Sequence, residues 1–263
     1  MGTAAVNGIE IDYEDSGGDG PAVLFSHGFL MDHTMFDRQV EALAPDYRCI
    51  RWDERGFGGT VAPAEFSYWD SATDAVALLD HLGIDRAVFV GMSQGGFLSI
   101  RAALAAPDRV AGLVLIDSAA DVDDEETIGG YQQMLQGMQH GTDEDRAGIF
   151  AVVSGLILGD EALAAEWIPK WDARDPDQLV LAGGALLGRD DVSDRLGEIA
   201  CPALVVHGTA DQAITIDRAE AACAGLPDCR GLVKVEGAAH APNMTHAEVV
   251  NPPLREFLDA VTA

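Results

Sequence analysis

Residues 85–110 read DRAVFVGMSQGGFLSIRAALAAPDRV and place a serine between an apolar β-like run and an apolar helix-like run. Gly91 and Gly95 flank Ser93 at two residues on either side, which makes the pattern Gly-x-Ser-x-Gly. A strand that leads through this pattern into a helix forms a strained turn, the nucleophile elbow, which exposes the serine hydroxyl at the carboxyl end of a sheet. Small flanking residues let the two backbone segments pass closely. We therefore interpret Ser93 as a nucleophile rather than as a capping serine among structural glycines.

A serine hydroxyl is a weak nucleophile and needs a base that a carboxylate orients. On sheets with this elbow the acid follows the serine along the chain, and the histidine comes last. Asp211 lies just past the buried strand-like run ALVVHG, and His240 follows the next such run, LVKVEG. The carboxyl ends of parallel strands meet at one edge of a sheet. The sequence therefore predicts a catalytic triad of Ser93, Asp211 and His240.

Other acids and histidines compete for these roles. Asp117 also follows a buried strand, VAGLVLI, and is the alternative acid. His246 precedes the last helix and is predicted to be a surface or capping residue, whereas His207 lies at a strand end and is predicted to be in the core. The remaining histidines of this comparison have no strand-end context and are expected at the surface: His33, His81 and His140.

Acyl transfer also needs two backbone N–H groups aimed at the developing oxyanion. One predicted donor is Gln94, directly after the nucleophile, and the other is Phe29 in the loop AVLFSHGFLMD. His27 is expected to brace this loop rather than to transfer protons. Leu30 and Met92 adjoin the oxyanion loop and the nucleophile, so both are predicted to contact the substrate.

β-like and helix-like segments alternate along most of the chain, which predicts a largely parallel sheet covered on both faces. The expected strands are 9–14, 23–26, 49–52, 87–90, 110–117, 201–208 and 231–237. The expected helices are 34–44, 70–82, the run between Ser93 and Pro107, 217–225 and a last one from about 247.

The alternation stops between residues 119 and 198, where the chain is acidic at first and then helix-like. We therefore predict one α/β core domain, 1–118 and 199–263, interrupted by a helical insertion at 119–198. Most of the large apolar residues of the insertion are expected to pack its helices together, and Trp167 is the one singled out for substrate contact.

Composition bounds the partners. The 263 residues include 44 acidic and 16 basic ones, for a net charge of −28, so nucleic acid and anionic membranes are excluded as expected partners. A surface adapted to high salt and a genome that favours arginine over lysine both account for this balance, and both stay open. Hydrophobic residues make up 48% of the chain, which is enough for a buried core.

The chain shows neither a secretory leader nor an apolar run of membrane-spanning length, so a cytoplasmic location is expected. The four cysteines are expected to be reduced, and Cys223 and Cys229 are the only pair close enough to suspect of bonding. No metal-ligand set or cofactor motif is recognised. A homodimer is left open.

Together these segments resemble the α/β-hydrolase superfamily over nearly the whole chain. The matching pieces are HGF (27–29), DERGFGGT (53–60), GMSQGG (91–96), HGTADQAI (207–214) and EGAAH (236–240). The resemblance implies a doubly wound, mostly parallel sheet with a helical cap over the active site. It also implies structural roles for Asp53 and Arg55.

Subfamily signals are mixed. Ser93 stands where haloalkane dehalogenases and epoxide hydrolases carry an aspartate. The stretch from 235 to 258 resembles cofactor-free perhydrolases, but those usually have a proline where this chain has Leu30. The front segment HGFLMDHTMFDRQVEAL resembles small esterases and enol-lactonases.

The expected function is cofactor-free hydrolysis of small to medium apolar carboxylic esters or lactones through an acyl-enzyme. Perhydrolysis, thioester hydrolysis and carbon–carbon bond hydrolysis are alternatives on the same triad. A non-catalytic ligand receptor is the alternative from a different class.

Overall fold

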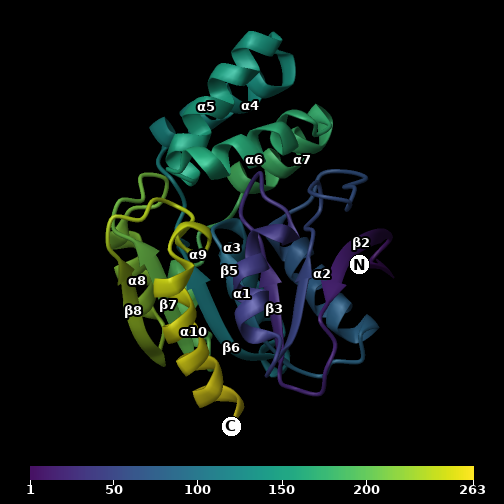
Figure 1. The fold of residues 1–263 in the computed structure, drawn as a ribbon, viewed down its shortest axis with the longest axis vertical. Coiled ribbons are helices and arrows are strands. Elements are labelled where there is room, and N and C mark those ends of the chain that lie inside the picture. The colour runs from purple at the N-terminus through teal and green to yellow at the C-terminus, as the bar shows by residue number, and fades with distance from the viewer.

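An eight-stranded, mostly parallel sheet forms the centre of the molecule (Figure 1). The structure is a computed structural model that describes all residues from 1 to 263. The strands are β1 Gly2–Val6, β2 Ile9–Asp15, β3 Ala22–Ser26, β4 Arg48–Trp52, β5 Ala87–Met92, β6 Val110–Ile116, β7 Ala203–Gly208 and β8 Cys229–Val235. Their order is β1-β2-β4-β3-β5-β6-β7-β8. β2 pairs antiparallel with β1 and β4, and all other neighbours are parallel. β1 was not among the strands predicted from the sequence.

Helices cover both faces of the sheet, as predicted. The helices are α1 Asp37–Leu43, α2 Tyr68–His81, α3 Gln94–Ala105, α4 Glu125–His140, α5 Asp143–Ile157, α6 Glu161–Asp172, α7 Pro176–Leu187, α8 Ile216–Gly225, α9 Pro242–Thr245 and α10 Ala247–Thr262. Three short 3-10 helices are η1 His33–Phe36, η2 Pro107–Arg109 and η3 Ser193–Glu198. Buried residues of α2, α3 and α8 form one core cluster, and those of α1 and α10 belong to the other.

The alternation of side chains along β5 explains why this strand lies in the centre of the sheet. Ala87 and Phe89 pack into one core cluster, while Val88 and Val90 pack into the other. Successive side chains of a strand point to opposite faces, so a strand buried on both sides is continuously apolar. The run before Ser93 therefore places this predicted nucleophile at the middle of the carboxyl edge.

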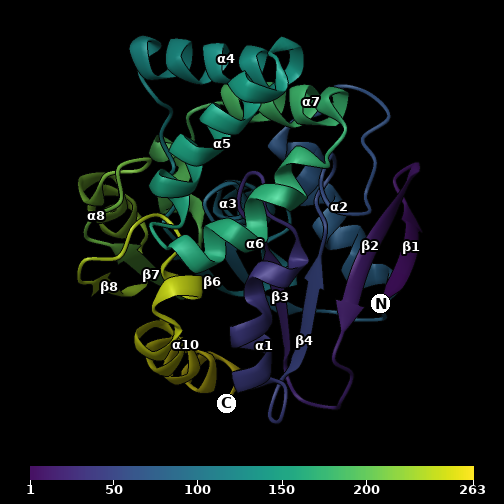
Figure 2. The same ribbon diagram turned by 45° about the horizontal axis from the view of Figure 1, so that its top comes forward.

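The four helices α4 to α7 lie together beyond the carboxyl edge of the sheet, and we call them the cap (Figure 2). The expected insertion at 119–198 extends past these helices, because η3 packs against α3 and α8 and Leu196 belongs to the core cluster. The cap helices themselves end at Leu187. None of the helices combines the length and the apolar character needed to span a bilayer.

Cys223 and Cys229 form a disulfide, which corrects the expectation that all four cysteines are reduced. Cys223 lies in α8 and Cys229 begins β8, so a short connection brings their Cα atoms to 5.5 Å. This separation lies within the range that a disulfide bridges. Cys49 and Cys201 are free thiols.

We expect Gly95→Ala to lower the free energy of unfolding by about 3 kcal/mol, because an overfilled core must shift its backbone. A Cβ at Gly95 would lie 2.0 Å from the carbonyl oxygen of Ser26 in β3. Urea denaturation measures the change. The matched control is Gly155→Ala in α5, where a Cβ meets nothing within 4 Å and alanine should stabilise the helix by up to about 1 kcal/mol. Equal effects at the two positions would contradict this close approach.

Candidate active site

Ser93 lies on the turn between β5 and α3 with φ 51° and ψ −116°. Residues other than glycine rarely adopt a backbone conformation with positive φ. The turn brings Gly91 against Gly95, because a Cβ at Gly91 would lie 2.1 Å from the carbonyl oxygen of Gly95. Hydrogen bonds hold the strained residue. The Ser93 N–H donates to the Ile116 carbonyl, and the Ser93 carbonyl accepts from the Ser118 hydroxyl and from the N–H groups of Gly96 and Phe97. Such strain persists only where surrounding contacts enforce it, and it is typical of functional sites.

Asp211 and His240 meet at the carboxyl ends of β7 and β8. The His240 Nδ1–H donates to Asp211 Oδ2 at 2.7 Å, which leaves Nε2 as the free nitrogen of the ring. The other carboxylate oxygen, Oδ1, accepts the N–H groups of Ala213 and Ile214. Burial alone would raise the pKa of Asp211, but the charge and hydrogen bond of His240 lower it below its ordinary value. Asp211 is therefore ionised and able to orient a base.

Ser93 and His240 line the same cavity between the sheet edge and the cap. The Ser93 hydroxyl makes no hydrogen bond to the imidazole in this structure. Catalytic hydrogen bonds are often long without substrate and shorten in the complex, so the shared cavity is the informative observation.

The backbone N–H groups of Phe29 and Gln94 have no acceptor within the protein. Gln94 is the first residue of α3, where N–H groups have no partner inside the helix and the helix dipole favours negative charge. Phe29 lines the cavity beside Ser93. Two unpaired donors near one hydroxyl are what oxyanion stabilisation requires.

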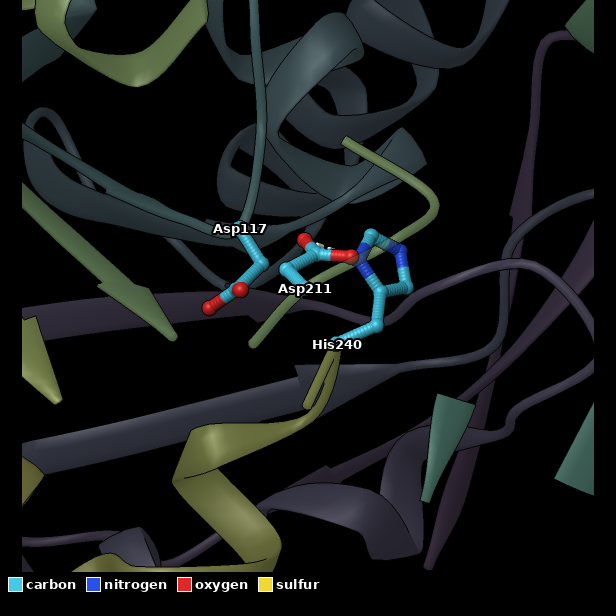
Figure 3. Close-up of side chains that lie close together, drawn as sticks. All are labelled: Asp117, Asp211 and His240. Atoms are coloured by element: carbon cyan, nitrogen blue, oxygen red, sulfur yellow. Dashed lines mark hydrogen bonds and ion pairs between the residues drawn. The ribbon is translucent and has the colours of Figure 1, made fainter. Parts of the chain in front are cut away.

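Asp117, the alternative acid, lies beside Asp211 rather than in place of it (Figure 3). Its side chain is fully buried, and only the Gly208 N–H donates to it, at 3.0 Å, while Oδ2 has no partner. Burial, followed by the charge of Asp211, raises the pKa of Asp117 well above its ordinary value. Two close buried carboxyl groups cannot both ionise readily, and Asp117 is the one that keeps its proton.

Asp117, Asp211 and His240 also bring one potential metal ligand each within 4.8 Å, a grouping that the sequence did not reveal. The Asp211 oxygens and the His240 Nδ1 are already bonded to each other and to backbone amides. A metal ion would have to break these bonds. The donor set therefore fits an acid–base pair with a protonated neighbour better than a metal centre.

The cavity lining corrects two of the three predicted substrate contacts. Leu30 lines the cavity, but Met92 is buried beneath it against Gly28, and Trp167 is buried within the cap. Trp167 instead packs under Lys170, whose Nζ lies 3.9 Å from the ring centre. The large apolar residues of the cap were expected mainly to pack its helices together. More of them line the cavity than predicted: Met134, Leu135, Met138, Leu156 and Ile157.

Several residues that line the cavity were not predicted from the sequence. Phe97 could have been found, since it lies one helical turn after Ser93 on α3. Asp123, Tyr131 and Arg189 had no detectable signal, because only the fold of the cap brings them to the cavity of Ser93.

Histidines brace the loops around the predicted oxyanion donors. His27 accepts the Glu54 N–H at Nε2 and donates from Nδ1 to the Gly28 carbonyl, in agreement with the predicted bracing role. His33 is buried and bonded to Asp53 at 2.8 Å, so its expected surface position is wrong. The short helix η1 turns this histidine inward, and local sequence contains no sign of its partner. Asp53 makes the structural contacts that the family resemblance implied.

Glu54 connects both halves of the predicted oxyanion hole. Its backbone donates to His27 in the loop of Phe29, and its side chain accepts from Gln94 Nε2 at 3.0 Å. The side chain is buried, Oε1 has no partner, and burial raises the pKa of Glu54 well above its ordinary value. Glu54 is therefore a neutral carboxylic acid in the folded protein.

We expect Glu54→Gln to become progressively more stable than the wild type as pH rises above 4.5. The unfolded wild type releases the Glu54 proton above that pH while the folded state keeps it, so unfolding becomes easier by up to about 1.4 kcal/mol per pH unit until the folded pKa is reached. Glutamine has no such titration and retains an acceptor for Gln94. Urea denaturation between pH 5 and 8 measures the difference. Parallel curves for the two proteins would mean that Glu54 is ionised in the fold.

Comparison with known proteins agrees with this fold. Residues 21–247 match the family model described as alpha/beta hydrolase fold. A putative non-heme chloroperoxidase from Synechocystis sp. is 30% identical over 95% of both chains. An esterase from Thermogutta terrifontis superposes with a TM-score of 0.86 at 29% identity, covering 99% of this chain and 97% of that one. The enol-lactonase from Burkholderia xenovorans superposes with a TM-score of 0.87 at 26% identity, covering 98% of this chain and 100% of that one.

The chain therefore belongs to the α/β-hydrolase family. Relatives named as hydrolases and relatives named as haloperoxidases both lie within it, so the reaction has to be argued from the site.

Proposed function

We propose that the protein is a serine hydrolase that cleaves carboxylic esters or lactones of small to medium size through an acyl-enzyme. The observation that carries this proposal is the bonded pair of His240 and Asp211, which shares an apolar cavity with the strained Ser93. Thirteen of the 17 residues that line the cavity are hydrophobic, which favours an apolar substrate.

In the proposed reaction Ser93 Oγ attacks the carbonyl carbon while His240 Nε2 takes the hydroxyl proton. Asp211 holds the imidazole and stabilises its charged form. The N–H groups of Phe29 and Gln94 stabilise the oxyanion, each by about 3–4 kcal/mol. His240 then protonates the leaving alcohol, and a water molecule activated by the same base hydrolyses the acyl-enzyme.

The backbone at Leu30 supports hydrolysis over perhydrolysis. Leu30 has φ 67°, whereas a proline ring holds φ near −65°. The proline found at this position in perhydrolases would require a different course of the loop next to Phe29.

A fluorophosphonate probe tests the proposal. The intact protein should be modified once, on the peptide that contains Ser93, and should release p-nitrophenolate from p-nitrophenyl butyrate. Heat-denatured protein is the control for non-specific labelling. Modification elsewhere, or none, contradicts the nucleophile, and labelling without turnover of any ester or lactone in a panel favours the ligand receptor.

A further inference from the structure

Two charged residues of the cavity have no part in the proposed chemistry. Asp123 precedes α4 and Arg189 follows α7, so they lie on the segments where the chain enters and leaves the cap. Arg189 Nη2 lies 2.7 Å from Asp123 Oδ2, and both side chains are buried. The remaining lining is apolar apart from Ser93, His240 and the Tyr131 hydroxyl.

The Arg189 guanidinium keeps an unused donor. Nη1 donates to the Leu186 carbonyl and Nη2 to Asp123, while the buried Nε–H has no partner. Leaving a buried charged donor unpaired costs more than leaving a neutral one unpaired. Nη1 and Nη2 each carry a second N–H group besides the one already used, and an acceptor supplied by a ligand in the cavity would give the guanidinium a further partner.

Tyr131 of α4 offers a second unused donor on the same cavity. No residue of the protein hydrogen-bonds to its hydroxyl. Burial, and then the charge of Asp123, raises the pKa of Tyr131, so the phenol stays protonated. Asp123 is already engaged by Arg189 through Oδ2 and by Arg218 through Oδ1. The protein therefore supplies two donors here and leaves their acceptor to the ligand.

Both donors line the same cavity as Ser93, and Arg189 is connected to it through Phe97. The Arg189 guanidinium carbon is 4.5 Å from the centre of the Phe97 ring, and the Phe97 N–H donates to the Ser93 carbonyl. One helical turn, about 5.4 Å along the axis, separates Ser93 from Phe97. A group bound by Arg189 would thus lie in the same cavity as the carbonyl that Ser93 attacks.

The charges around Arg189 in the cavity wall decide which kind of acceptor can bind to it. Arg189 and Arg218 are balanced by Asp121 and Asp123, and the whole chain carries −28. A carboxylate would gain little from this balanced cluster and would be repelled by the protein as a whole. An uncharged oxygen accepts the same hydrogen bonds without that repulsion.

We propose that Arg189 and Tyr131 bind an uncharged oxygen acceptor, a ketone, ether or amide carbonyl, in the acyl chain of the substrate. This inference rests on the proposed function, because it names the substrate class of that same site. It makes the preferred substrate an oxygen-bearing acyl ester or lactone rather than a plain hydrocarbon one.

Isosteric substrates test the inference. p-Nitrophenyl pentanoate is compared with the ethoxyacetate and 3-methoxypropanoate esters, in which one CH2 is replaced by oxygen, and with the mono-p-nitrophenyl ester of glutarate. Each kcat/KM is divided by the rate of alkaline hydrolysis to remove intrinsic reactivity. The wild type should prefer one ether ester over pentanoate by about tenfold, the size expected for a hydrogen bond to a charged donor.

Variants separate substrate binding from support of the cap. Tyr131→Phe and Arg189→Met should both bring the ether-to-pentanoate ratio towards one, and Arg189→Lys should lower it while keeping a cation for Asp123. The control is Arg146→Met, which removes a cap arginine paired with Asp143 and Asp172 on the surface and should leave the ratio unchanged.

Three outcomes would overturn the inference. An equal fall of both rates in the Arg189 variants would show a purely structural arginine. A wild type without preference would remove the acceptor site while leaving the proposed function intact, and a preference for glutarate would show that the wall selects carboxylates. A wild type that hydrolyses none of the esters would instead contradict the proposed function itself.

Discussion

Replacing Ser93 with alanine is expected to lower kcat for ester hydrolysis by about 10⁶-fold, the loss seen when the nucleophile of a serine triad is removed. Alanine keeps the backbone and the cavity but has no oxygen to form the acyl-enzyme. Initial rates with p-nitrophenyl butyrate, together with active-site titration by the fluorophosphonate probe, measure the loss. Ser118→Ala is a less suitable control, because the Ser118 hydroxyl donates a hydrogen bond to the Ser93 carbonyl and its loss would disturb the turn.

A glycine variant extends this experiment to stability. Ser93→Gly should be as inactive as Ser93→Ala. Its melting temperature should be higher than that of Ser93→Ala, because glycine adopts φ 51° and ψ −116° without the strain that a side chain imposes. The two variants thus separate the cost of the elbow from its chemistry. Retention of more than about 1% of wild-type activity in either variant would exclude Ser93 as nucleophile, given the expected loss.

Asp211→Asn is expected to lower kcat by about 10⁴-fold, because an amide at this position favours the wrong tautomer of His240. Asp117→Asn should change kcat no more than a few-fold, since the Asp117 carboxyl is already neutral and the amide is close to its shape. The two residues are a matched pair, buried beside each other at the ends of neighbouring strands. Steady-state kinetics with one ester across pH 6 to 9 compares them.

The double variant decides whether Asp117 replaces a missing Asp211. Burial still raises the pKa of Asp117 when Asp211 is neutral, but the additional effect of the Asp211 charge is gone, so Asp117 ionises more readily. Asp211→Asn with Asp117→Asn should then be less active than Asp211→Asn alone. If Asp117→Asn by itself were the more damaging change, Asp117 and not Asp211 would be the acid of the triad.

The predicted fold depended on local signals and agrees with the structure in most elements. Central strands such as β5 are continuously apolar and short, so they stand out in the sequence. β1 was missed because its burial alternates weakly along GTAAV at the edge of the sheet.

The site was predictable to the extent that strand ends define it. Asp211 and His240 could be paired from the amino-acid sequence, because both follow parallel strands of one sheet, and the hydrogen bond between them agrees with that pairing. The substrate contacts predicted for Met92 and Trp167 were wrong, because neighbours along the chain do not specify which way a side chain points. Both are buried away from the cavity.

The sequence by itself determined the elbow, the order of its predicted partners and the class of fold, since spacing and hydrophobic alternation are properties of the chain alone. Only the tertiary structure decided which of two neighbouring aspartates keeps a proton, that Glu54 is neutral, and that Arg189 and Tyr131 line the cavity. Protonation depends on burial and on charges distant in sequence, and the cavity depends on how the cap lies over the sheet. Neither is written in any local pattern of residues.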